Sequence, residues 1–162
     1  MGGEFAQNDE WQESKSLDWH LVQYPEHSQI QDLIKNLNET YRRNTSLWER
    51  DTSPSGFKWL IEDDGSRNII AFARLSDTGE NLISVTNFSP VTQELFQLPL
   101  PDGGDWYEIL NTDATKYGGS GVVNEIVHAE ANPFRNEPYS ANLRVPPLGT
   151  LWLTRRNHKE SN

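Results

Sequence analysis

The histidines could ligate a metal ion or act as a general base, so their spacing is informative about chemistry. Four occur, far apart in the sequence: His20, His27, His128 and His158. None belongs to an HxH or HExxH arrangement, in which two imidazoles face one ion. Zinc needs ligands that converge, and this spacing suggests no such set. We therefore expect no metal site.

Carboxylates could act in pairs as general acid and base. The candidates are the adjacent Asp63 and Asp64, together with Asp18. Asp63 and Asp64 precede Gly65 and Ser66 in a predicted turn, where Asp is favoured because its side chain bonds to the backbone. No Ser-His-Asp arrangement or other nucleophile is recognisable. The sequence therefore predicts no catalytic centre of its own.

The glycine-rich stretch Gly118–Gly121 follows Lys116–Tyr117 and superficially resembles a phosphate-binding loop. Such a loop lies between a strand and a helix whose N-terminus completes the anion site. Here the strand-like Val122–Val123 follows instead. We expect these glycines to serve the conformation of a long hairpin loop.

The six tryptophans could fill a core or offer flat faces to a ligand. Trp59, Trp106 and Trp152 lie inside predicted strands, so we expect them in the core of a sandwich. The other three lie outside clear strands, and their roles are left open: Trp11, Trp19 and Trp48.

Composition narrows the class of protein. The chain has 162 residues, enough for one domain with a core, and a formal charge of −10. Without a basic stripe, neither a nucleic acid nor an anionic membrane surface is an expected partner. No apolar run approaches the ~18 residues of a membrane span, and no signal peptide is visible. The absence of cysteine excludes disulfides and thiolate catalysis, and is compatible with a cytoplasmic location.

One stretch, from Ser28 to about Arg43, has the apolar period of an amphipathic helix. Its stripe consists of Ile30, Leu33, Ile34, Leu37 and Tyr41. Ser28 followed by Gln31 fits a capping box, and Arg42 suits the negative end of the helix dipole. We expect another surface to cover this stripe.

The rest of the chain divides around this helix. Residues 1–21 are irregular but rich in aromatic side chains, so we expect them to pack on a larger body. The polar stretch from Arg50 to Gly56 is a boundary. From Phe57 onward, seven or eight short alternating runs separated by turn residues predict an antiparallel β-sandwich, and hence a mainly β fold. The predicted parts are residues 1–50, a β-domain of residues 51–155, and a mobile tail of residues 156–162.

Several short motifs occur together, in the order and with the gaps of one enzyme family. They are MGGEFAQ at 1–7, EW at 10–11, SLDWHL at 16–21, DLIKNLN at 32–38, YR at 41–42, GFKW at 56–59, NFSPV at 87–91, EILNTD at 108–113, YGGSG at 117–121 and PPL at 146–148. Together they resemble the C-terminal part of bacterial 1,4-α-glucan (glycogen) branching enzymes, of the α-amylase superfamily. The resemblance covers essentially residues 1–155.

This resemblance implies that residues 1–50 end a catalytic (β/α)8 barrel, including its last helix, and that residues 51–155 are its α-amylase-type C-terminal β-domain. The family cuts an α-1,4-glucan chain and transfers it to a 6-hydroxyl through a covalent glycosyl-enzyme intermediate, without metal or cofactor. Its nucleophile and acid/base residues come from barrel strands that have no counterpart here. The chain alone is therefore expected to be non-catalytic.

The resemblance also suggests positions for contact with α-glucan. Glu4, Gln7 and Trp11 would lie at the rim of the glucan cleft, where Trp11 either faces a sugar ring or only wedges its loop against the barrel. Trp48 and Trp106 are weaker candidates for a surface contact with glucan. The expected partners are α-glucan and the barrel in cis. In the isolated chain, the helix stripe is expected either to bind a second copy or to fold back on the β-domain.

Two other classes of function remain open at this point. One is a free-standing carbohydrate-binding module that uses the same aromatic residues. The other is an independent hydrolase, which is disfavoured because retaining chemistry needs two carboxyl groups about 5–5.5 Å apart across a cleft, and no stretch suggests such a cleft.

Overall fold

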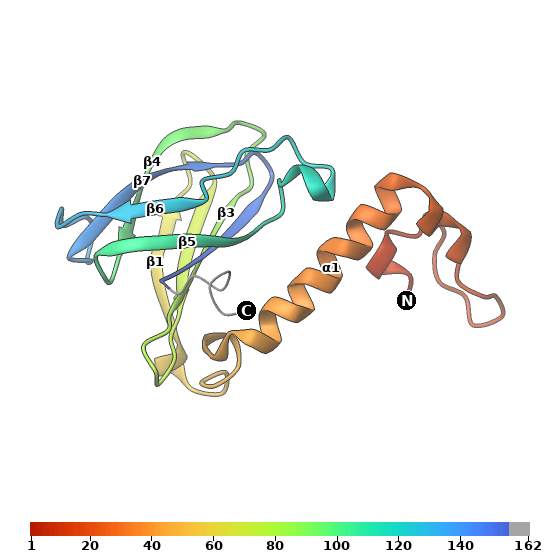
Figure 1. The fold of residues 1–162 in the computed structure, drawn as a ribbon, viewed down its shortest axis with the longest axis horizontal. Coiled ribbons are helices and arrows are strands. Elements are labelled where there is room, and N and C mark those ends of the chain that lie inside the picture. Colours follow the sequence, from red (N-terminus) through yellow and green to blue (C-terminus); the bar gives the residue numbers. More distant parts are fainter. Residues whose placement is uncertain (156–162) are drawn as a thin grey trace.

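The computed structural model of the protein describes residues 1–155; the predicted tail, residues 156–162, lies outside the described residues. Figure 1 shows a β-sandwich and a long helix that reaches away from it to the N-terminal loops. Over residues 1–155, no helix combines the length and the apolarity that crossing a membrane requires. The elements are the 3-10 helices η1 (Gly3–Phe5), η2 (Trp19–Gln23), η3 (Thr45–Leu47), η4 (Pro54–Gly56) and η5 (Thr115–Tyr117), the helix α1 (Pro25–Arg43), and the strands β1 (Phe57–Asp64), β2 (Ile69–Arg74), β3 (Leu82–Asn87), β4 (Gln93–Leu100), β5 (Gly104–Asn111), β6 (Ile126–Ala129), β7 (Tyr139–Val145) and β8 (Thr150–Thr154).

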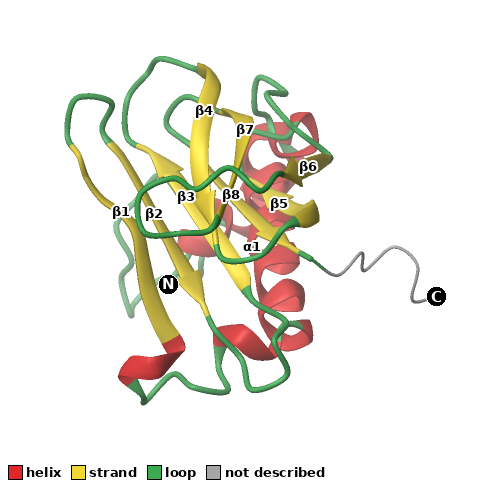
Figure 2. Cartoon of the chain, turned by 90° about the vertical axis from the view of Figure 1, so that its left-hand side faces the viewer, coloured by secondary structure: helices red, strands yellow, loops and turns green. Residues whose placement is uncertain are grey.

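Within the described residues, the eight strands form two antiparallel sheets. The larger sheet has the order β1-β2-β3-β8-β5-β6, and the smaller pairs β4 with β7. Figure 2 shows β4 and β7 lying across one face of the larger sheet. The predicted mainly β, antiparallel fold is therefore confirmed.

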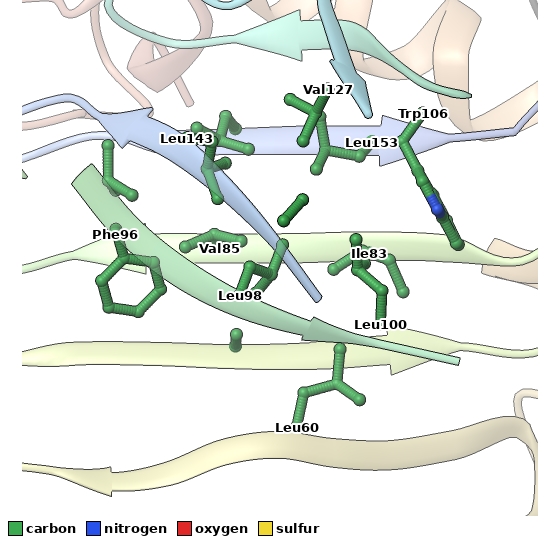
Figure 3. Close-up of a cluster of buried hydrophobic side chains, with 14 of the residues drawn as sticks. Leu60, Ile83, Val85, Phe96, Leu98, Leu100, Trp106, Val127, Leu143 and Leu153 are labelled. Atoms are coloured by element: carbon green, nitrogen blue, oxygen red, sulfur yellow. The ribbon is translucent and has the colours of Figure 1, made fainter. Parts of the chain in front are cut away.

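The hydrophobic core fills the space between the two sheets (Figure 3). In β2, the buried Ile69, Ala71 and Ala73 alternate with half-buried residues, as expected when one face of a strand points into a core. From the smaller sheet, Phe96 and Leu98 of β4 are at most 1% exposed. Each such large apolar side chain contributes roughly 1.5–3 kcal/mol by leaving water. The opposite face of the larger sheet remains available for other contacts.

Helix α1 begins at Pro25, three residues before the predicted start at Ser28. Pro25 occupies the first turn, where a missing N–H costs nothing and a fixed φ favours the helix. The predicted capping box is wrong: the Ser28 hydroxyl donates to the Pro25 carbonyl at 3.2 Å, inside the first turn. The N-cap is Tyr24, whose side chain makes no capping bond.

The apolar stripe of α1 is covered only in part. Near its N-terminal end the helix contacts η1 and η2, and it also contacts η5 and β5 of the sandwich. At the contact with η5, Gly118 lies so close that a Cβ there would be 2.8 Å from Oε1 of Gln29. None of the five stripe residues is fully buried, and Tyr41 is 46% exposed. The chain itself therefore leaves part of this surface open.

Candidate functional site

Three aromatic side chains gather on the outer face of the larger sheet. Phe57 and Trp59 are two residues apart on β1, and Trp59 is opposite Phe72 of β2 in the strand register, so all three share one face. The ring centroids of Phe57 and Phe72 are 5.2 Å apart, and Trp59 meets Phe57 edge-on at 5.0 Å. This aromatic cluster (Phe57, Trp59 and Phe72) therefore presents aromatic surface to solvent.

Trp59 is 46% exposed, so the prediction that it lies in the core is wrong. The cause is a register shift between Trp59 and Ile61, typical of a β-bulge, which buries Leu60 and Ile61 together. Strict alternation of buried and exposed residues would bury Trp59, two residues before the buried Ile61. The bulge interrupts that alternation, and Trp59 is exposed instead. Trp152 of β8 is half-buried on the same outer face rather than in the core.

A polar groove of about 160 Å³ lies beside Trp59. Its lining includes Asp63, Arg135 and Asn136 next to the indole. Arg135 donates a hydrogen bond to Asp63, and that bond together with the positive charge of Arg135 lowers the pKa of Asp63 below its usual value. Asp63 is thus an anion paired with Arg135, so the groove combines a flat apolar ring with a hydrogen-bond acceptor and donors.

A second groove, of about 320 Å³, separates the same sheet face from α1. Phe72 and Trp152 form its sheet side, and Tyr41 belongs to the helix side. Arg74 donates to the Asp51 carboxylate at 2.7 Å and so ties the sheet to the segment after the helix. The aromatic cluster lies between the two grooves, because Phe72 lines this one and Trp59 lines the other.

The N-terminal candidates are only partly brought together. Gln7 and Trp11 line one small pocket with Asp18, and Trp11 is 44% exposed. Glu4 lies in η1 and is not among the residues of that pocket. Whether these residues face a glucan cleft stays a prediction.

Of the two tryptophans expected at a surface contact, Trp48 is 43% exposed and Trp106 is fully buried. The indole N–H of Trp106 donates to the Asp102 carbonyl at 3.1 Å, within the sandwich. Trp106 therefore cannot contact glucan, and that part of the prediction is wrong. Its expected place in the core is confirmed.

The glycine-rich loop directs its backbone donors to the chain itself. The Asp113 carboxylate accepts from the N–H groups of Ser120 and Val122, each at 2.9 Å, and from the Ser120 hydroxyl at 2.7 Å. Gly118 and Gly121 have φ values of 83° and 85°, which favour glycine. A carboxylate of the protein thus occupies the position that a phosphate would need.

The pair Asp63 and Asp64 is engaged by arginines. Asp64 accepts from Arg67, and this hydrogen bond lowers the pKa of Asp64 despite its burial. Asp63 is held by Arg135 on the other side. Asp63 and Asp64 are the last two residues of β1, just before the turn, and their main partners are arginine side chains rather than the turn backbone that the sequence predicted. Asp64 also accepts from the Ser66 hydroxyl within the turn.

Sequence comparison relates the chain to carbohydrate-active enzymes. Residues 59–156 match the family described as "Alpha amylase, C-terminal all-beta domain". The chain is 44% identical over 155 residues to the 1,4-alpha-glucan branching enzyme GlgB of Aquifex aeolicus, covering 94% of this chain and 25% of that protein. It is also 44% identical over 160 residues to a GlgB of Streptomyces avermitilis, covering 94% of this chain and 19% of that protein. The chain thus spans about a quarter or less of the length of these curated relatives.

Among solved structures, the catalytic module of the pneumococcal glycogen-degrading virulence factor SpuA matches 88% of this chain and 20% of its own, with a TM-score of 0.53 and 13% identity. At that identity the likeness shows the fold alone. Since 88% of the chain is covered, the shared fold is not limited to part of the sandwich.

Proposed function

Because the chain belongs to the family of alpha-amylase C-terminal all-beta domains, we propose that it is the C-terminal part of a 1,4-α-glucan branching enzyme. The intact enzyme transfers an α-1,4-glucan segment to a 6-hydroxyl through a covalent intermediate. Its nucleophile and acid/base groups lie outside this chain. The chain supports the catalytic barrel and contributes contacts to glucan.

One observation carries this proposal: the similarity to GlgB proteins covers 94% of the chain at 42–44% identity. A match of 155 residues is too long for the β-domain alone, so it includes most of the N-terminal loops and α1. The division at residues 50 and 51 into barrel end and β-domain belongs to the same proposal.

Direct contact with α-glucan is proposed for the aromatic cluster. Aromatic rings bind the apolar faces of sugars, and polar groups beside them can bond to the hydroxyls. Trp59 offers such a ring, and Asp63 and Arg135 in the adjoining groove offer an acceptor and donors. Trp48, also exposed, remains a second candidate.

The same cluster would suit a free-standing carbohydrate-binding module, which is the alternative. The half-covered stripe of α1 favours the larger enzyme. An apolar helix face that the sandwich leaves exposed indicates contact with another surface, which a free-standing module would not provide. The stripe is proposed to face the catalytic barrel in cis and, in the isolated chain, to pair with a second copy. A cytoplasmic location stays a prediction.

The proposed function is tested by comparing the full-length gene product with this chain alone on amylose. Iodine absorbance and reducing ends separate branching from hydrolysis. We expect branching by the full-length protein and no turnover by the chain. Hydrolysis without new branches by the full-length protein, or turnover by the chain that survives repurification, would contradict the proposal.

A further inference from the structure

The side chain of Gln7 closes a loop that carries Trp11. Its Nε2 donates to the Asp9 carbonyl at 2.9 Å, and its Oε1 accepts from the backbone N–H of Asp18, also at 2.9 Å. One amide therefore joins the entry and the exit of the Trp11 loop (residues 8–17). The Gln7 amide thus uses one of its two N–H groups and one lone pair of its oxygen to hold the loop.

The base of the Trp11 loop is anchored to α1. Phe5 is fully buried, and its ring lies 5.1 Å from that of Trp19, just beyond the loop. The Phe5 carbonyl accepts from Nδ1 of His27 in the first turns of the helix, at 2.8 Å. The entry and the exit of the loop are thus also held by the ring pair of Phe5 and Trp19 and by the hydrogen bond from His27 to Phe5.

The backbone around Gln7 is shaped to hold it there. The N–H of Gln7 donates to the Gly2 carbonyl at 2.9 Å. Gly2 has a φ of 87°, and a Cβ on Gly2 would lie 2.9 Å from the Cβ of Gln7. Glycine at position 2 therefore leaves the space that the Gln7 side chain occupies.

From this arrangement we infer that Gln7 is a positioning residue, which fixes the Trp11 loop so that the Trp11 indole faces a glucan chain, and does not contact glucan itself. A loop of this length loses considerable conformational entropy when it is ordered, and the two hydrogen bonds of Gln7 offset part of that loss. Trp11, 44% exposed, is the side chain of the loop suited to a sugar face. The inference rests on the proposed function for the identity of the ligand.

The closure of the loop is tested in this chain by amide hydrogen exchange. Gln7→Ala should raise the exchange rate of the Asp18 amide about tenfold, since its acceptor is lost, while β3 amides keep their protection. Gln7→Glu, which retains an acceptor for Asp18, should restore most of that protection. Gln12→Ala is the matched control, because its side chain lines the same pocket and makes no hydrogen bond within residues 1–155.

Trypsin gives a second readout of the same closure. Lys15 is exposed within the Trp11 loop, so opening the loop should accelerate cleavage after Lys15 in Gln7→Ala but not in Gln12→Ala. If Asp18 exchange and Lys15 cleavage are both unchanged in a folded Gln7→Ala variant, Gln7 does not close the loop and the inference fails.

The role toward glucan is tested in the full-length enzyme by a double-mutant cycle with Gln7→Ala and Trp11→Ala. Each single variant should raise KM for amylose about fivefold with a smaller change in kcat, and the double variant should match Trp11→Ala alone. Additive effects would instead show that Gln7 contacts glucan directly, which overturns the inference. A full-length protein without branching activity would overturn the proposed function, and the exchange rates would still decide whether Gln7 closes the loop.

Discussion

Trp59 stands on β1 between an edge contact with Phe57 and a second edge contact, at 6.0 Å, with Phe72. These neighbours restrict the rotation of the indole, so little side-chain entropy remains to be lost when a sugar binds. Trp59→Ala should therefore weaken binding of maltoheptaose to the chain about tenfold, measured by calorimetry.

Trp48→Ala tests the second candidate for the glucan contact beside Trp59→Ala. Trp48 is similarly exposed, at 43% against 46% for Trp59, but it lies outside the aromatic cluster. If only Trp48→Ala loses binding, glucan contacts Trp48 and not the aromatic cluster on the sheet face. Equal losses in both variants would indicate that exposed indoles bind without selectivity.

The carboxylate of Asp113 organises the glycine-rich loop and should make stability depend on pH. Burial alone would raise the pKa of Asp113, but hydrogen bonds from Ser120, Val122 and Gly121 outweigh it and leave the pKa below its usual value. A carboxyl group whose pKa falls on folding adds stability above its unfolded pKa, and that stability is lost as pH falls through the folded pKa.

Asp113→Asn should accordingly lower the free energy of unfolding by about 1 kcal/mol at pH 7. The difference from the wild type should begin to shrink below the unfolded-state pKa of about 3.9, and it should disappear only below the lower pKa of the folded carboxyl. Urea unfolding at pH 7 and pH 3.5 measures both values. A difference that stays constant with pH would mean that the Asp113 charge contributes nothing.

Individual residues show which side-chain positions the sequence patterns predict and which they do not. Trp106 follows strand alternation and is buried as predicted, whereas Trp59 escapes the core because of a bulge that alternation does not reveal. The bonds of Gln7 were equally hidden, because they join residues on both sides of an irregular loop. The period of apolar residues predicts only regular helices and strands. The bulge at Trp59 and the loop closed by Gln7 lie where the backbone is irregular, so the period does not predict them.

Among the elements, α1 and η5 meet where Gly118 faces Gln29. Gly118→Ala places a Cβ 2.8 Å from Oε1 of Gln29 and also strains a residue with a φ of 83°. The left-handed conformation alone costs about 1–2 kcal/mol for a residue with a side chain. Because the Gln29 amide is the flexible end of its side chain and can swing away, we expect only a small increase in amide exchange in the N-terminal half of α1.

Gly121→Ala separates the two effects. Gly121 has a similar φ of 85°, but its added Cβ would meet Thr115 at 3.0 Å rather than the helix. Both variants should lose global stability, and only Gly118→Ala should change exchange in α1. Similar exchange in the two variants would show that η5 does not support the helix.

The existence of α1 and a count of seven or eight strands follow from apolar period and turn residues, since these reflect which faces of the backbone are buried. The start of the helix does not follow in the same way. Ser28 offers a capping pattern, but Pro25 already fits the first turn and the helix extends to it. The capping pattern at Ser28 was therefore misleading, because Pro25 has no N–H that needs a hydrogen-bond partner and so begins the helix three residues earlier.

For the whole molecule, the open stripe of α1 predicts association of the isolated chain. Leu33→Glu together with Leu37→Glu places charge within the half-covered stripe, which should disfavour a second copy there. Light scattering should then show the mass falling to the 18.6 kDa of one chain, with the β-sheet circular dichroism retained.

The control carries the same new side chains on the exposed face of the helix, as Gln31→Glu with Lys35→Glu. It should keep the mass of the wild type. A wild-type chain that is already monomeric at 18.6 kDa would refute association through α1.

At this scale the sequence motifs indicate the class of fold, but not the order of strands within the sheet. Turn residues show that β1, β2 and β3 are consecutive neighbours, because short turns join antiparallel strands. Nothing local shows that β8 pairs with β3 and β5, which are distant in the sequence. Such pairings depend on how the two sheets share one core.

The position of β8 has a consequence for synthesis of the protein. β8, the last of the eight strands within residues 1–155, lies between β3 and β5 near the middle of the larger sheet. Nascent chains fold from the N-terminal side as they leave the ribosome. Here the edges of β3 and β5 that pair with β8 stay unpaired until residue 154 has left the ribosome. A premature stop codon only a few codons before Thr150 would therefore remove an interior strand and leave two exposed edges, a risk for aggregation rather than a harmless trimming.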